Sequence, residues 1–144
     1  MQPTELYEYD FNEWIVQQIA LLKQGRTNEI DAIHLITELE EMGKSHLREL
    51  ESRFIILIAH LLKWQFQPNQ QSSSWRGSIN EQRLQLSRLL RKTPSLKPEV
   101  THAVTEVYQD ALELAIDDTG LAASTFPTTC PYSIEQLLDK TFYP

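Results

Sequence analysis

Charge is sorted along this chain into three blocks of alternating sign. Residues 1–43 carry nine acidic and two basic side chains, residues 44–97 carry three acidic and ten basic, and residues 98–144 carry eight acidic and one basic. The blocks have formal net charges of −7, +7 and −7, which give the chain its total of −7 at pH 7. This order predicts a fold in which the basic middle lies against the acidic ends, with cations left over for an anionic partner.

Apolar residues recur at helical spacing through most of the sequence. They predict helices over residues 8–24, about 28–66, 74–92 and 95–119, followed by an irregular segment and a short last helix over 134–140. Gly25 and Gly120 stand where a helix C-terminus favours glycine, and Ser133 with Gln136 is a capping-box pattern. Gly43 interrupts the long helical pattern, which predicts a bend, a close helix contact or a break there.

The expected fold class is all-α, an up-and-down bundle of four to five helices, because short connections make neighbouring helices antiparallel. Only four glycines and a globular composition, 41% hydrophobic and 23% charged, agree with this class. A chain of 144 residues can build one core without disulfides, so we expect one domain over residues 1–144. In the predicted hairpin at Pro94, Arg91 would approach Glu99, and Arg76 would approach Glu113 or Asp117.

The sequence favours a reduced, cytoplasmic protein without a membrane partner. Cys130 is the only cysteine, so an intrachain disulfide and a cysteine-based zinc site are excluded. Glu5, Glu8 and Asp10 stand where a signal peptide needs apolar residues. The longest apolar run, Phe54 to Leu62, is far shorter than the ~20 residues of a membrane span.

A set of short motifs spread over nearly the whole chain is more specific than any one of them. It consists of Tyr9-Asp10-Phe11, Trp14, Asp31, Glu38, Gly43, His60-Leu-Leu-Lys-Trp-Gln-Phe-Gln-Pro68, Ser74-Trp75-Arg76, Ile79, Gln82-Arg83, Pro94-Ser95-Leu96, Phe126-Pro127, Cys130-Pro131-Tyr132, Leu137-Leu138, Phe142 and Pro144. With these motifs the chain resembles the twenty-ninth family in the series of bacterial domains of unknown function. The resemblance implies a helical bundle and brings no established activity. The family tends to have a glutamate where this chain has Thr37, which weakens any model of an adjacent acidic pair at that point.

Cations and aromatic residues gather where the second predicted helix ends and the third begins. A helix N-terminus offers free N–H groups to an anion, and aromatic rings can stack on bases. We define the basic-aromatic patch as the candidate surface for binding a ligand or partner, made of Lys63, Trp64, Trp75, Arg76 and Arg83. The alternative is structural, with the tryptophans in the core and the cations paired with the acidic ends.

Two arrangements of acidic residues suggest a catalytic or metal-binding site instead. Glu38 and Glu41, with His60, could serve a metal-dependent hydrolase or nuclease acting on a phosphate-containing substrate. Asp31-x-x-His34 and Glu99-x-x-His102 have the spacing of di-iron bundle ligands, a spacing that also arises easily by chance. A solvated polar helix side explains the first arrangement more simply, so we expect no bound metal and no cofactor.

The sequence therefore favours an interaction or regulatory module without enzymatic activity over a hydrolase. Its partner, bound through the basic-aromatic patch, would be a protein or a nucleic acid, and the sequence specifies neither the partner nor the oligomeric state. Overall acidity, with a pI of about 5.0, argues against sequence-independent DNA binding over the whole surface.

Overall fold

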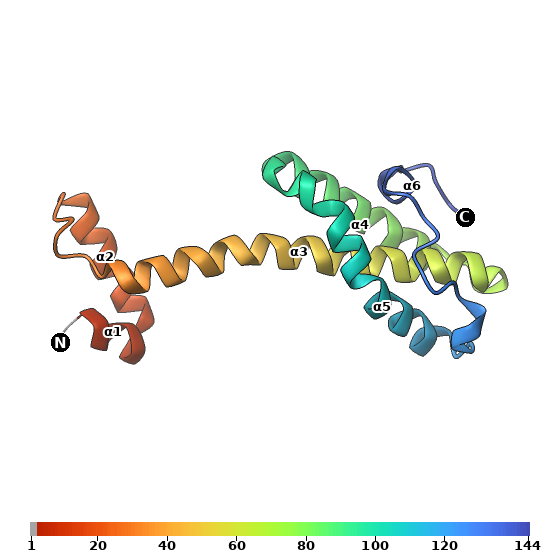
Figure 1. Ribbon diagram of the computed structural model, residues 1–144, viewed down its shortest axis with the longest axis horizontal. Helices are drawn as coiled ribbons and strands as arrows, with labels where there is room; N and C mark the ends of the chain where they lie inside the picture. Colours follow the sequence, from red (N-terminus) through yellow and green to blue (C-terminus); the bar gives the residue numbers. More distant parts are fainter. Residues whose placement is uncertain (1–2) are drawn as a thin grey trace. The chain divides into compact units, whose positions relative to one another are not determined.

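The fold is an all-α helical bundle with an irregular C-terminal segment and a short last helix, as predicted (Figure 1). The computed structural model describes residues 3–144, with side chains from residue 5, and all regular elements in that range are helical. The α-helices are α1 Pro3–Tyr9, α2 Phe11–Lys23, α3 Ala32–Phe66, α4 Ser73–Lys92, α5 Val100–Thr119 and α6 Ile134–Leu138. Short 3₁₀ helices lie at η1 Pro68–Gln70, η2 Pro94–Glu99 and η3 Ala123–Thr125.

The chain divides into two compact units. The first unit extends to Lys44 and contains α1, α2 and the start of α3, and the second unit covers Ser45–Pro144. The prediction of one domain over the whole chain stays a prediction.

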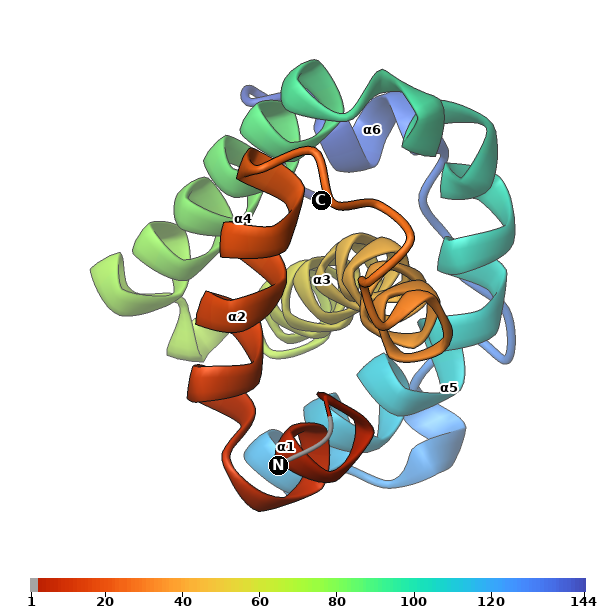
Figure 2. The ribbon, with the colours of Figure 1, turned by 90° about the vertical axis from the view of Figure 1, so that its left-hand side faces the viewer.

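The second unit has a continuous apolar core. It is built from the second half of α3, from α4 and α5, and from the C-terminal segment, whose helix α6 contacts α4 (Figure 2). Its fully buried side chains are Leu50, Phe54, Leu57, Ile58, Ala59, Leu61, Leu62, Ile79, Leu86, Ala111, Ala115 and Leu137. This core makes the second unit a rigid support for the polar side chains around it.

Local signals fix several helix ends where the sequence predicts them. Gly25 and Gly120 both have φ of +70°, the left-handed conformation that glycine adopts without strain. The Ser72 hydroxyl accepts a hydrogen bond from the backbone N–H of Trp75, which caps α4. Ser133 and Gln136 form the predicted capping box at α6.

Two predicted helix starts are wrong. The first predicted helix is two helices, because Asp10 follows α1 and its carboxylate caps α2 by accepting from the N–H of Glu13 at 3.1 Å. The fourth predicted helix begins at Val100 instead of Ser95, since Pro98 disfavours α conformation in the residue before it and residues 94–99 form a 3₁₀ helix.

The ion pairs expected across the α4–α5 hairpin are also wrong. Within the described residues, Arg91 does not pair with Glu99, and Arg76 pairs with neither Glu113 nor Asp117. A salt bridge joins α3 to α5 instead, between Lys63 Nζ and Asp118 Oδ2 at 3.0 Å. Helical spacing identified charged faces, but it could not set which cation meets which carboxylate.

Helix α3 continues without interruption through Gly43, so the predicted break there is wrong. A Cβ added at Gly43 meets no atom within 4 Å, so a close helix contact is not the reason for this glycine either. We expect Gly43→Ala to stabilise the protein by about 0.5–1 kcal/mol, the helix preference of alanine over glycine. Urea denaturation followed by circular dichroism measures this change.

Two other glycines provide controls for that measurement. Gly77→Ala in α4 has equally open surroundings and should give a similar gain. Gly25→Ala should destabilise the protein, because its φ of +70° strains any residue with a Cβ. A Gly43→Ala variant that is less stable than wild type, beside a stabilised Gly77→Ala variant, would contradict the prediction.

Candidate interaction site

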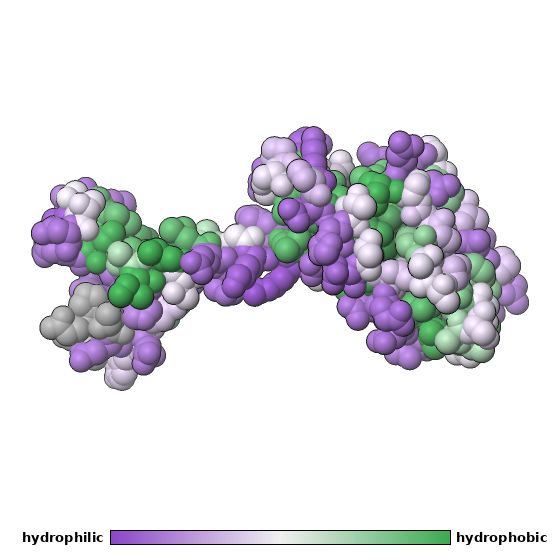
Figure 3. All heavy atoms as spheres, viewed as in Figure 1, coloured by the Kyte–Doolittle hydropathy of each residue, from purple (hydrophilic) through white to green (hydrophobic). Residues whose placement is uncertain are grey.

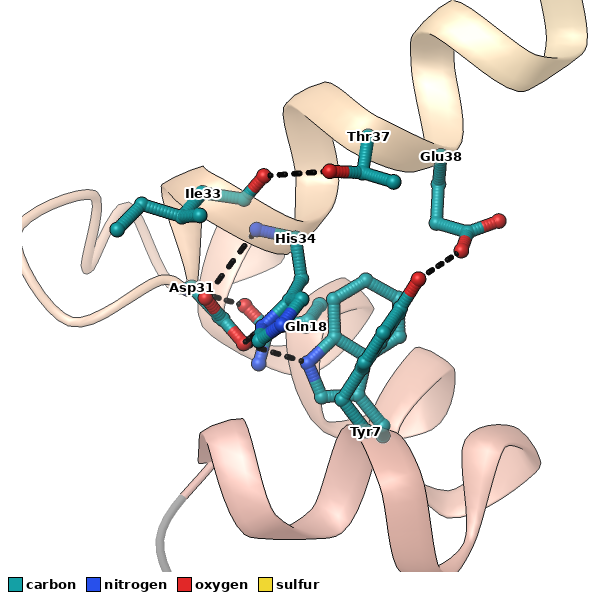
Figure 4. A network of polar contacts seen from close by, with 8 residues as sticks. Tyr7, Gln18, Asp31, Ile33, His34, Thr37 and Glu38 are labelled. Atoms are coloured by element: carbon teal, nitrogen blue, oxygen red, sulfur yellow. Dashed lines mark hydrogen bonds and ion pairs between the residues drawn. The ribbon is translucent and has the colours of Figure 1, made fainter.

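A buried carboxylate organises the first unit. Asp31, only 8% exposed, precedes α3, and its Oδ2 accepts hydrogen bonds from Trp14 Nε1 at 3.1 Å and lies 2.7 Å from His34 Nδ1 (Figure 4). Its backbone N–H donates to Gln18 Oε1 at 2.7 Å, while the buried Nε2 of Gln18 has no hydrogen-bond partner among the described residues. Burial raises the pKa of Asp31, but hydrogen bonds from His34 and Trp14 outweigh burial and bring the pKa below its ordinary value. The network holds α2 against the start of α3.

Tyr7 of α1 contacts two residues of the same network, His34 and Trp14. Its ring stacks on His34 with centroids 3.9 Å apart and meets Trp14 edge-on at 4.9 Å. Its hydroxyl donates to Glu38 Oε1 at 2.5 Å, and this hydrogen bond raises the pKa of Tyr7. Glu38 therefore serves to hold α1 in place, which the sequence did not predict. Thr37 beside it is exposed, and its hydroxyl donates a hydrogen bond to the Ile33 carbonyl one turn earlier in α3.

An apolar groove of about 370 Å³ lies between α2 and α3 in the first unit. Glu38 is a charged residue in its lining, and the other lining residues are almost all apolar. We call this site the α2–α3 groove, and it is lined by Phe11, Trp14, Ile15, Gln18, Ile19, Leu22, Leu35, Glu38, Leu39 and Met42. Both walls have the i, i+3, i+4, i+7 spacing of a helix face that packs against another helix.

Large apolar side chains stay open to solvent in and around this groove (Figure 3). Leu39 is 64% exposed, and Ile33, on α3 outside the groove, is 76% exposed. Among the described residues of the first unit, the other large apolar side chains that are exposed are Tyr9, Phe11, Val16, Ile19, Leu22, Ile36 and Met42. This is more exposed apolar surface than a folded unit of this size usually leaves in water.

The predicted basic-aromatic patch comes together in the second unit, but two of its cations are used inside the fold. Lys63 is 5% exposed, pairs with Asp118 and lies 5.0 Å from the ring centre of Trp75. Arg76 is exposed and lies 5.4 Å from the ring centre of Trp64. Trp64 and Trp75 are half-buried, so the accessible part of the patch is these two rings and Arg76.

Arg83, the fifth residue of the patch, is 2% exposed and holds the C-terminal segment in place. Its guanidinium donates to three backbone carbonyls, those of Leu137 at 2.9 Å, Phe142 at 2.8 Å and Gln136 at 3.1 Å. Burial lowers the pKa of Arg83, although an arginine still stays protonated at neutral pH. The sequence could not indicate this role, because the acceptors lie more than fifty residues further along the chain.

The residues of the hydrolase alternative belong to different units. Glu38 and Glu41 lie in the first unit, whereas His60 lies in the second, where its Nδ1 is 2.8 Å from the Ile56 carbonyl oxygen and burial lowers its pKa. Across the described residues, no group of three His, Cys, Asp or Glu side chains is arranged to hold a metal ion. The hydrolase and di-iron readings stay hypotheses.

The chain is thus a helical-bundle protein with an apolar groove on its first unit. It belongs to the family described as domain of unknown function DUF29, whose model matches residues 6–143. Comparisons with curated proteins and with solved structures found no match. In the part of the chain that the structure describes, no helix combines the length and the apolar character needed to cross a membrane.

Proposed function

We propose that this protein is a non-enzymatic interaction module that binds another protein through the α2–α3 groove. The observation that carries the proposal is the set of exposed apolar side chains along both walls of that groove. Leaving this much apolar surface in water costs about 25 cal/mol per Å², and a partner that covers it recovers that free energy.

The partner that fits the groove is an amphipathic helix. Each wall is itself a helix, with its apolar residues on one face, and a third helix can lay its own apolar ridge between them. The 13 residues of α2 give a wall about 20 Å long, which three to four turns of a partner helix would match.

The negative charge of the first unit favours a partner helix whose polar face is basic. Residues 1–44 carry nine acidic and three basic side chains, a net charge of −6, and Glu38 lines the groove. A partner helix with lysine or arginine beside its apolar face would be attracted by this field. A second copy of the chain would bring the same net charge of −6 and be repelled, so self-association through this surface is disfavoured.

Designed peptides test this proposal without a known partner. The probe is a 15-residue helix with leucine at i, i+3, i+4, i+7 and i+11 and lysine on its other face, labelled for fluorescence anisotropy. We expect it to bind, and we expect a matched peptide with glutamate in place of lysine to bind at least tenfold more weakly.

Matched variants of the protein locate the binding. Leu39→Ser removes an exposed groove side chain and should weaken the lysine peptide about tenfold, because burying a leucine contributes about 1.5–3 kcal/mol. Leu84→Ser changes an exposed leucine of α4 in the second unit and should leave binding unchanged. The proposal would be overturned if the lysine peptide did not bind, or if Leu39→Ser and Leu84→Ser lost the same affinity for it. Sedimentation that shows dimers of the wild-type chain, dissociated by Leu39→Ser, would also overturn it.

The basic-aromatic patch stays a candidate for a second contact surface. The feature that favours it is Arg76, whose exposed guanidinium lies 4.6 Å from the ring centre of Tyr143 as well as near Trp64. An arginine held against aromatic rings keeps its outward N–H groups available for a carboxylate or phosphate. With Lys63 and Arg83 engaged internally, this surface has far less free charge than the sequence predicts.

A further inference from the structure

A second pocket, of about 380 Å³, lies wholly within the second unit. It is formed where α4, η2 and the segment around α6 meet, and α4 and η2 contact each other as do α4 and α6. We call it the cationic pocket. Its lining residues are Arg83, Ser87, Leu90, Arg91, Lys97, Leu138 and Lys140. Its volume is in the range of small-molecule sites.

Four of these lining residues are basic and none is acidic, in a protein whose net charge is −7. Arg91, Lys97 and Lys140 are exposed, and none of them forms an ion pair with any described residue. Arg83 lies in the same lining and its hydrogen bonds go to neutral carbonyls. It forms no ion pair with a described carboxylate, although the charge of the nearby Asp139 partly offsets the lowering of the Arg83 pKa by burial. Positive charge is therefore concentrated in this concavity, where low-dielectric walls strengthen its field.

Ordinary structural roles explain only part of this cluster. Arg91 lies in the last turn of α4, where a cation interacts favourably with the helix dipole. Lys97 lies in the last turn of the short 3₁₀ helix η2 and Lys140 follows α6, so an effect at the end of one helix does not explain why both lie beside Arg91. The neighbouring Asp139 carboxylate accepts hydrogen bonds from the N–H and the hydroxyl of Thr141, and Asp139 is not in the lining.

We infer that the cationic pocket binds the phosphate group of a small phosphorylated molecule. Arginine offers paired N–H donors that match phosphate oxygens, and lysine adds mobile point charges. Ser87 supplies a hydroxyl donor, and Leu90 and Leu138 give the apolar contact that a sugar or ring attached to the phosphate requires. This site goes beyond the proposed function, because it uses none of the residues of the α2–α3 groove.

Calorimetric titration of the full chain with inorganic pyrophosphate tests the inference. We expect one site per chain, and we expect Arg91→Gln combined with Lys97→Gln to weaken binding at least tenfold. The matched control is Arg88→Gln combined with Lys92→Gln, which removes the same charge from the exposed side of α4 outside this pocket. The control should change affinity less than threefold, and all four substituted side chains are exposed, so the fold should be kept.

Three results would overturn the inference. The first is no pyrophosphate binding to the wild-type chain, and the second is an equal loss in both double variants, which would indicate non-specific attraction to net charge. The third is equally tight binding of citrate at the same ionic strength, which would indicate a general anion site without phosphate recognition.

Discussion

Replacing Arg83 with methionine is expected to lower the free energy of unfolding by about 3 kcal/mol. The guanidinium is 2% exposed and donates to three carbonyls around α6 and the C-terminus, so its loss leaves three buried or half-buried acceptors without donors. Methionine fills similar volume, which limits the cavity contribution. In a chain of this length the change corresponds to a fall in Tm of roughly 10 °C.

In the Arg83→Met variant, the loss of stability should be largest in the C-terminal segment that Arg83 holds. Helix α6 has only five residues and depends on its capping box and on Arg83, so residues 134–143 should exchange amide hydrogens and be cleaved by protease before the rest of the core. Arg88→Met, on the same helix but exposed, serves as the control and should cost less than about 0.5 kcal/mol. Equal stability of the two variants, or unchanged protection of residues 134–143, would show that Arg83 is not the anchor of this segment.

Arg83 also shows where sequence reasoning stops. Helix ends were predictable because their causes are local, as at Gly25, Gly120 and the Ser133 capping box. The partners of Arg83 were not, since 53 to 59 residues separate the guanidinium from its acceptors. The positive charge of Arg83 made it a candidate binding residue. The sequence alone does not distinguish an arginine exposed at the surface from a buried one that holds another segment.

The α2–α3 groove was missed for a different reason. The apolar spacing of Phe11, Ile19 and Leu22, and of Leu39 and Met42, correctly predicts amphipathic helices. Such a pattern indicates that a face is to be covered without indicating what covers it. The available signal was composition, because the first 44 residues offer too few elements to bury two apolar helix faces.

The second large effect is expected at Asp31. Asp31→Ala should cost about 2 kcal/mol in the stability of the first unit, because the buried indole N–H of Trp14 loses its acceptor and His34 loses its partner. Asp31→Asn keeps a side-chain oxygen for Trp14 and should cost about half as much. The direct readout is exchange of the Trp14 indole proton by NMR, which should speed up strongly in Asp31→Ala and only moderately in Asp31→Asn.

The pH dependence of the free energy of unfolding is an independent test of the role of the Asp31 charge. The folded-state pKa of Asp31 is below its ordinary value of about 3.9, so the stability that its charge contributes is fully present above pH ~5. That contribution is lost as the pH falls below about 4 and through the lower folded-state pKa. Asp31→Asn cannot titrate, so its stability relative to wild type should improve on acidification. The prediction would be contradicted if the difference in free energy of unfolding between wild type and Asp31→Asn stayed constant from pH 7 to pH 3 and exchange of the Trp14 indole proton were unaltered. The charge of Asp31 would then not hold α2 against α3.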